Sequence, residues 1–293
     1  MSPRFGRVLT AMVTPFDDDG ALDLGAAAEL AQFLVETGSD GLVLAGTTGE
    51  SPVLSESEAA ALFRRVRESV EVPLLAGAGS NSTAHAVELA RMATDSGVDG
   101  ILTVTPYYNR PPQAGLLHHF SAVAAATELP VMIYDIPGRT GRKVATETLL
   151  SLASEVENVV AVKDAAGDVR ESARLVAQAP PGFELYSGED ALTLPLLSVG
   201  AVGVVGVASH WAATQLGDMI DAHAKGDVAT ARRINAELGE SFAFESSDDA
   251  PNPIPTKAMM RVLGLRVGHC RPPMVGEPPD LESRARGVIE GLG

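Results

Sequence analysis

Lys163 is the residue whose type and position point most directly to covalent chemistry. The chain has four lysines against eighteen arginines, and this one closes the apolar run VVAV at 159–162. The other three stand in polar or helical contexts: Lys143, Lys225 and Lys257. A buried ammonium is costly unless it is paired or loses its proton. A neutral lysine amine attacks ketones to form an imine. The alternative for Lys163 is a structural ion pair with Asp135 or Asp164.

Hydroxyl groups are placed at the ends of three other apolar runs. The stretch GTTGES at 46–51 puts Thr47 and Thr48 side by side between glycines, directly after DGLVLA. Tyrosine is scarce, with four in the chain, yet Tyr107 and Tyr108 follow one apolar run and Tyr134 closes another. Such groups can bind an anion or pass a proton. Aromatic packing at a rim or an interface is the alternative for the tyrosines.

Metal and phosphate sites are disfavoured. None of the six histidines joins a carboxylate at the end of an apolar run in a ligand pattern. His118 and His119 are adjacent in a helical stretch, where neighbours point to different faces, so they are surface or packing residues. Barrel phosphate sites use the loops after the last two strands. Here the first of those loops carries Glu189 and Asp190, which repel a phosphate. These patterns therefore argue against a metal site and against a phosphate site.

Eight apolar runs are expected to position these groups. Most are Leu-rich or β-branched without polar alternation, as in strands of a parallel sheet that are buried on both faces. They span residues 8–13, 40–45, 72–78, 99–105, 129–134, 159–163, 183–187 and 202–208. Amphipathic helical patterns lie between them, for example at 24–38, 55–70, 82–97 and 146–156. Several open with capping residues, and two end at Gly38 and Gly97.

This alternation predicts an α/β fold, a (β/α)8 TIM barrel with a C-terminal helical appendage. Residues 1–225 are expected to form the catalytic barrel and residues 226–293 the helical region, where no strand pattern occurs. An open doubly wound sheet is the alternative, but the first run ends in TPF rather than in a glycine-rich nucleotide loop. In a barrel, groups at the carboxyl ends of the strands meet on one face, which would bring the candidates together.

Composition limits the partners. A formal net charge of −16 disfavours binding to nucleic acid and to anionic lipid surfaces. The single cysteine, Cys270, excludes an internal disulfide and favours a reducing compartment. No stretch approaches the length of a membrane-spanning helix, and the N-terminus has no signal-peptide pattern. We therefore expect a cytoplasmic protein.

Five motifs together resemble those of the dihydrodipicolinate synthase family, within the superfamily of pyruvate-dependent class I aldolases. They are GTTGES, TPYYNRPP, YDIPGRTG, VAVKDAAGD and NPIPTKAMM, and their order and spacing match over essentially the whole chain. The motifs are jointly specific, whereas GTTGE alone would place only the superfamily.

The resemblance implies a role for each candidate. It implies that Lys163 forms the imine, that Tyr134 exchanges a proton beside it, and that Thr47 and Tyr108 complete a proton relay. Tyr108 would come from the partner across a tight dimer interface. The resemblance places the following residues in substrate binding: Thr48 and Val205 at pyruvate, Arg139 at the carboxylate of aspartate semialdehyde, and Gly188.

The implied reaction is the condensation of pyruvate with L-aspartate 4-semialdehyde in diaminopimelate and lysine biosynthesis, without metal or cofactor. The implied assembly is a homotetramer, a dimer of tight dimers. A sister aldolase acting on a sugar acid is an alternative, disfavoured by Arg139 and the YYN stretch. A non-enzymatic barrel is another, disfavoured by the intact set of hydroxyls and the lysine. Lysine-regulated members carry an acid where this chain has His85 and histidines where it has Glu56 and Ala59, so we expect weak lysine inhibition or none.

Overall fold

Eight parallel strands close into a barrel in the computed structural model, which describes residues 3–292. Each strand pairs with its neighbours in sequence, and β8 pairs with β1 to complete the ring. The bounds are β1 Val8–Ala11, β2 Gly41–Leu44, β3 Leu74–Gly77, β4 Gly100–Val104, β5 Val131–Asp135, β6 Val159–Asp164, β7 Glu184–Ser187 and β8 Gly203–Gly206. Each predicted run corresponds to one strand, although β5 and β6 each extend one residue beyond the run, so the predicted barrel is confirmed.

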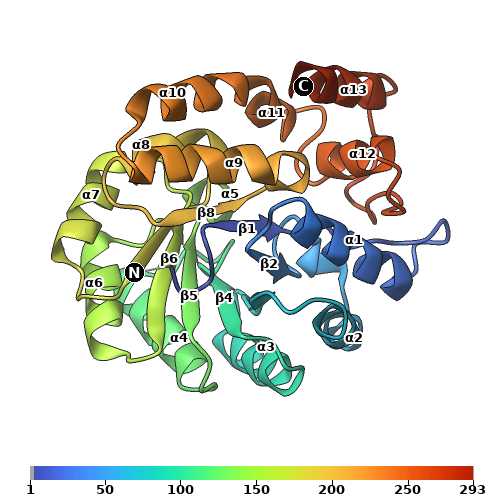
Figure 1. The fold of residues 1–293 in the computed structure, drawn as a ribbon. Coiled ribbons are helices and arrows are strands. Elements are labelled where there is room, and N and C mark those ends of the chain that lie inside the picture. The colour runs from blue at the N-terminus through green and yellow to red at the C-terminus, as the bar shows by residue number, and fades with distance from the viewer. Residues whose placement is uncertain (1–2, 293) are drawn as a thin grey trace.

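Helices cover the outside of the barrel (Figure 1). Their bounds are α1 Leu24–Glu36, α2 Glu56–Arg67, α3 Thr83–Asp95, α4 Gln113–Ala124, α5 Pro137–Thr140, α6 Thr146–Glu155, α7 Val169–Gln178, α8 Thr193–Leu197 and α9 Ser209–Ala224. Two short 3-10 turns accompany them, η1 Ser51–Val53 and η2 Asp190–Leu192. Ser55 caps α2 through a reciprocal capping box with Glu58, and Gly38 and Gly97 follow α1 and α3 with positive φ. These are the expected start and stop signals.

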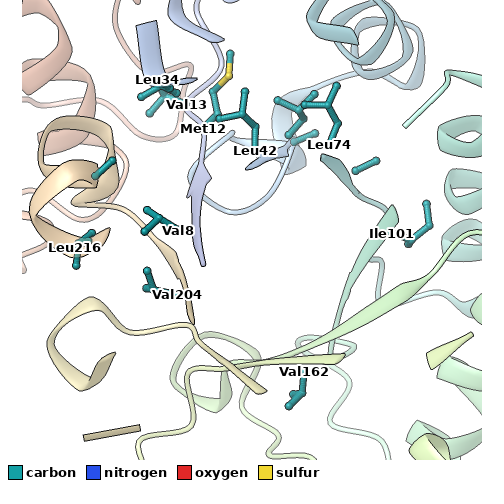
Figure 2. Close-up of a cluster of buried hydrophobic side chains, with 14 of the residues drawn as sticks. Val8, Met12, Val13, Leu34, Leu42, Leu74, Ile101, Val162, Val204 and Leu216 are labelled. Carbon is teal, nitrogen blue, oxygen red and sulfur yellow. The ribbon is translucent and has the colours of Figure 1, made fainter. Parts of the chain in front are cut away.

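The main hydrophobic core lies between the strands and the surrounding helices. Figure 2 shows side chains from several strands, such as Val8, Leu42 and Val162, together with Leu34 and Leu216 from α1 and α9. A second, smaller core fills the inside of the barrel with residues including Leu9, Met132 and Tyr186. Strands buried on both faces explain why the runs lack polar alternation.

Four more helices follow the barrel elements: α10 Val228–Glu237, α11 Gly239–Phe244, α12 Ile254–Val262 and α13 Leu281–Leu292. They gather beside α9, coloured orange to red in Figure 1. Within residues 3–292, no helix is long and apolar enough to cross a membrane.

Candidate active site

A one-residue bulge in β6 determines the direction in which the Lys163 side chain points. Val131 of β5 pairs with Val159, but the next residue, Met132, pairs with Ala161, so Val160 is extra. Beyond the bulge, Tyr134 lies directly opposite Lys163. Because side chains alternate along a strand, Lys163 shares the inner face of the barrel with Ala161. Bulges of this kind often aim a side chain beside an active site.

Lys163 is buried without an ion-pair partner. Its exposed fraction is 5%, and within residues 3–292 no carboxylate oxygen lies within 4.0 Å of its Nζ atom. The Nζ atom lies over the Tyr134 ring, 4.4 Å from its centroid. Asp135 and Asp164, the two acids predicted as possible ion-pair partners of Lys163, face outward instead. The structural ion pair predicted as the alternative for Lys163 is therefore absent.

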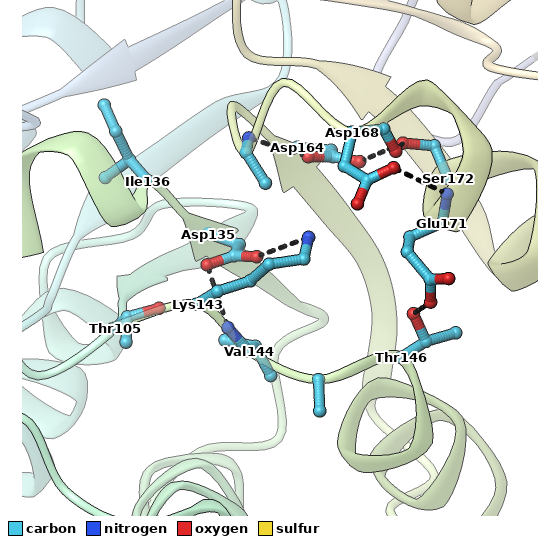
Figure 3. A network of polar contacts seen from close by, with 12 residues as sticks. Thr105, Asp135, Ile136, Lys143, Val144, Thr146, Asp164, Asp168, Glu171 and Ser172 are labelled. Carbon is cyan, nitrogen blue, oxygen red and sulfur yellow. Dashed lines mark hydrogen bonds and ion pairs between the residues drawn. The ribbon is translucent and has the colours of Figure 1, made fainter. Parts of the chain in front are cut away.

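Figure 3 shows how the two aspartates are used. Asp135 pairs with Lys143 at 3.7 Å and accepts a hydrogen bond from the Val144 N–H. Asp164 accepts a 2.6 Å hydrogen bond from the Ser172 hydroxyl. Each aspartate directly follows an inward-facing residue, Tyr134 or Lys163. The outward contacts therefore fix the strand ends that carry the two inward groups.

Burial shifts the pKa values of Lys163 and Tyr134 in the directions that favour their uncharged forms. The pKa of Lys163 is lowered to about 8, chiefly by desolvation, although nearby Asp190, Glu189 and Glu245 oppose the shift. Desolvation raises the pKa of the Tyr134 phenol to about 12, while Arg139 and a hydrogen bond with Thr47 lower it. The neutral amine of Lys163 therefore accumulates as the pH approaches 8, where the Tyr134 phenol is still un-ionised, and this combination suits imine chemistry.

The threonine stretch follows β2 as a tight loop. Ala45 and Glu50 adopt left-handed backbone conformations, with φ of 49° and 57°, on either side of Thr47 and Thr48. Thr48 is 3% exposed, and its hydroxyl accepts a 2.9 Å hydrogen bond from the Asn252 side chain. Strained non-glycine backbone of this kind persists where surrounding contacts hold it, often at functional sites.

Gly188 and Val205 shape the space around the lysine. A Cβ atom on Gly188 would lie 2.9 Å from Cγ of Lys163, closer than real Cβ contacts come, and 3.1 Å from Cε, which is a tight contact. The Gly188 N–H donates to the Asp164 carbonyl, so the chain cannot easily move away. Val205 is fully buried within the inner core. The glycine therefore leaves the room that the Lys163 side chain occupies.

Arg139 and Tyr108 are exposed at the loops after β5 and β4. Arg139 lies in α5, and its Nη2 donates to the Asn252 carbonyl at 3.4 Å. Its positive charge also lowers the pKa of Lys163 and of Tyr134. Tyr108 is 90% exposed with φ of 72°, while Tyr107 is 37% exposed. Thr47, Thr48, Tyr134, Arg139 and Lys163 are thus brought together, whereas Tyr108 points to solvent.

Two residues near the site were missed by sequence reasoning. Asn252 hydrogen-bonds both Thr48 and Arg139, although its stretch was noted only as part of the resemblance. Lys257 lies in α12, is 1% exposed and pairs with Glu50 at 2.7 Å. The helical context of Lys257 in the sequence did not indicate that the side chain is buried. The only available signal was the apolar composition around it, in IPTKAMM.

One group of possible metal ligands occurs within residues 3–292, formed by Glu56, His85 and Glu88. His85 Nδ1 lies 3.6 Å from Glu56 Oε1 and 3.8 Å from Glu88 Oε2. All three belong to α2 and α3 and are half-exposed or exposed. Exposed acidic groups of this kind are common without a metal.

Comparison with known proteins gives one consistent result. The model of the dihydrodipicolinate synthetase family matches residues 4–286. A 4-hydroxy-tetrahydrodipicolinate synthase from Parasynechococcus marenigrum is 52% identical over 98% of this chain and 95% of its own. The crystal structure of the dihydrodipicolinate synthase of Cyanidioschyzon merolae with lysine bound has a TM-score of 0.96 and 44% identity, covering 100% of this chain and 99% of that one. A dihydrodipicolinate synthase from Bacillus anthracis has a TM-score of 0.95 and 39% identity, with 99% of both chains covered.

Proposed function

This chain belongs to the dihydrodipicolinate synthetase family, and from that premise we propose that Lys163 is the amine that carries its reaction. The reaction is the condensation of pyruvate with L-aspartate 4-semialdehyde to 4-hydroxy-tetrahydrodipicolinate, in diaminopimelate and lysine biosynthesis. The observation that carries the assignment is a buried lysine without an ion pair, beside a phenol, with its pKa lowered to about 8.

The first half-reaction builds a nucleophile from pyruvate. The Lys163 amine attacks the ketone carbon, and Tyr134 delivers a proton to the hydroxyl that leaves as water. Loss of a proton from the pyruvate methyl group converts the imine to an enamine. Thr47 passes protons between Tyr134 and the bulk, and the Thr48 hydroxyl and N–H hold the pyruvate carboxylate. Gly188 leaves room for the three-carbon unit of the bound pyruvate, and Val205 lines that space.

The second half-reaction forms the ring. The enamine carbon attacks the aldehyde of the semialdehyde, whose oxygen takes a proton. The amine of the same molecule then displaces Lys163 by transimination, which closes the ring and frees the enzyme. Arg139 binds the carboxylate of the semialdehyde through its guanidinium fork. Its hydrogen bond to the Asn252 carbonyl places it at the loop that also holds Thr48.

Borohydride trapping tests the assignment. Wild-type protein mixed with labelled pyruvate and borohydride should retain the label on the peptide that contains Lys163. Lys163→Ala should retain no label, because it lacks the amine. Lys163→Arg should also retain none, because a guanidinium stays protonated and cannot attack the ketone. The matched control is Lys225→Ala, which removes an exposed lysine at the end of α9 and should trap normally. A label on Lys163→Ala protein would mean that another lysine is the nucleophile.

Tyr108 supports a second proposal, that the active assembly is a homotetramer built from tight dimers. A tyrosine that is 90% exposed on a left-handed backbone is placed to enter a neighbouring subunit, where it would complete the proton relay. Mixing inactive Tyr108→Phe and Lys163→Ala chains should then restore part of the activity through hybrid sites. No recovery despite demonstrated subunit exchange would show that one chain builds the whole site.

The remaining expectations are proposed on the same basis. Residues 1–225 act as the catalytic barrel and residues 226–293 as a helical region that supports it, and the protein works in the cytoplasm. Lysine inhibits it weakly or not at all, because His85 stands where regulated members place an acid. His85 is already flanked by Glu56 and Glu88, within 3.6 and 3.8 Å.

A further inference from the structure

Asn252 uses all the polar groups of its backbone and side chain. It lies between α11 and α12 and is 8% exposed. Its backbone N–H donates to the Ser246 hydroxyl at 3.2 Å, and its carbonyl accepts from Arg139 at 3.4 Å. Its side-chain amide bonds Thr48 at 2.9 Å and Thr256 at 3.1 Å. A buried residue that is bonded to four separate partners is held in one position and one orientation.

The contact with Thr256 determines which way the amide of Asn252 points. The oxygen and nitrogen of an amide exchange places when the group turns over, so the hydrogen-bond partners decide between the two orientations. Thr256 is fully buried in α12 and donates its hydroxyl proton to Asn252 Oδ1. The Nδ2 group therefore faces Thr48 and donates to its hydroxyl oxygen.

This bond leaves the Thr48 hydroxyl with a free proton. A hydroxyl has one proton to donate and two lone pairs that accept, and an amide nitrogen can only donate. Asn252 therefore uses a lone pair of Thr48, and among residues 3–292 the Thr48 hydroxyl donates to no acceptor, although it is 3% exposed. A buried donor without an acceptor is costly. A carboxylate that enters with a substrate would satisfy it with a charge-assisted bond.

We propose that Asn252 is a positioning residue that holds the Thr48 hydroxyl as a donor toward the pyruvate carboxylate. This proposal rests on the role proposed for Thr48. Because Asn252 Nδ2 cannot accept a proton, the Thr48 hydroxyl cannot turn its proton away toward the C-terminal helical region. Without the amide, the hydroxyl would rotate freely and would have to be ordered when pyruvate binds. Ordering a binding group in advance increases affinity.

The contact with Arg139 separates this role from general support of the loop. Arg139 is bonded to the backbone carbonyl of Asn252, which every side-chain substitution retains. Loss of the amide should therefore weaken pyruvate binding and leave the proposed semialdehyde site in place. Displacement of the loop would instead weaken the binding of both substrates.

The test measures the borohydride trapping rate of Asn252→Ala against pyruvate concentration, and its KM for the semialdehyde in turnover. The half-saturating pyruvate concentration should rise about tenfold, the loss of roughly one well-formed hydrogen bond. The trapping rate at saturating pyruvate and the semialdehyde KM should stay close to wild type. Asn158→Ala is the matched control, because that amide donates to three backbone carbonyls, each at 3.0 Å, before the start of β6. The control should change neither constant.

A double-mutant cycle shows whether Asn252 acts through the Thr48 hydroxyl. In a Thr48→Val background the hydroxyl is absent, so adding Asn252→Ala should change the half-saturating pyruvate concentration by less than about twofold. Thr48→Ser keeps the hydroxyl, and there Asn252→Ala should again cost about tenfold. Additive effects in the Thr48→Val background would overturn the proposal. Equal losses for pyruvate and the semialdehyde in Asn252→Ala would overturn it as well.

Two further variants test the direction of the bond. Asn252→Asp has the same size but offers Thr48 only an acceptor, so it should impair pyruvate binding more than Asn252→Ala does; saturation like that of the wild type would overturn the proposed polarity. If the Asn252 variants do not fold, Thr256→Val should raise the half-saturating pyruvate concentration because it frees the amide to turn over, and Thr256→Ser should restore it. No difference between these two would also overturn the proposal. If wild-type protein traps no pyruvate at Lys163, the proposed function fails instead.

Discussion

The ion pair between Glu50 and Lys257 is expected to fix the threonine loop to the C-terminal helical region. Glu50 Oε1 and Lys257 Nζ are 2.7 Å apart, with side chains 2% and 1% exposed. The Lys257 amine also donates to the His269 carbonyl at 2.9 Å and lies 4.2 Å from the centroid of the Phe16 ring. Glu50 Oε2 accepts from the Arg271 N–H at 2.9 Å. The pair is therefore held by further contacts on both sides.

Lys257→Met should destabilise the protein by about 3–5 kcal/mol, the cost of leaving one buried charge without its partner. Glu50→Gln should cost a similar amount, because it leaves the ammonium buried. The double variant should cost less than the sum of the two, since neither charge remains. Glu50 is the second residue after Thr48 in the same loop, so either single variant should also raise the KM for pyruvate more than it lowers kcat.

Urea unfolding followed by the fluorescence of Trp211, the only tryptophan, measures these free energies. Trp211 lies in α9 and donates to the Ser241 hydroxyl of α11, so it reports on the contact with the helical region. Arg233→Met is the matched control: it breaks an ion pair with Glu237 whose side chains are 60% and 54% exposed, and it should cost about 1 kcal/mol or less. The reasoning is refuted if Lys257→Met costs no more than Arg233→Met, or if the costs in the double variant simply add.

Four further outcomes are expected. Gly188→Ala should lower the rate of pyruvate trapping at least tenfold, about 1.4 kcal/mol of barrier, because its Cβ would lie 2.9 Å from Lys163 Cγ; unchanged trapping would show that the lysine can move aside. The trapping rate of wild type should rise about tenfold per pH unit until it levels near pH 8, because the neutral amine accumulates as pH approaches the lowered pKa of Lys163; a rate that is flat from pH 6 to 8 would contradict this. Arg139→Ala should raise the KM for the semialdehyde far more than it weakens pyruvate trapping, and equal losses would indicate a role in holding the barrel mouth. L-Lysine should not reach half-inhibition in initial-rate assays below about 1 mM, a binding free energy of roughly −4 kcal/mol; tighter inhibition would show that Glu56 replaces the acid missing at His85.

The barrel could be predicted from the sequence because strands that are buried on both faces appear as short continuous apolar runs. Runs such as VVAV and GVVG need no distant information to predict strands, and caps such as Ser55 mark helix starts within a few residues. The position of Lys163 at the end of such a run identified it as buried. Eight alternating units without a nucleotide loop favour a closed barrel over an open sheet, so the meeting of strand ends could also be expected.

Tertiary structure alone decided which groups contact one another across long sequence separations. It placed Asp135 and Asp164 outward, so that Lys163 has no ion pair, through a bulge at Val160 that no local pattern reveals. It also buried Lys257, whose helical context in the sequence does not indicate burial.

The C-terminal helical region shows most clearly which contacts the sequence alone does not predict. Its sequence predicts helices, because amphipathic periodicity is local, but not that Asn252 hydrogen-bonds Thr48 or that Lys257 pairs with Glu50. Those contacts depend on how the region packs against the finished barrel. Periodicity therefore indicates which face of each element is apolar, whereas packing of the finished elements determines which buried polar groups become partners.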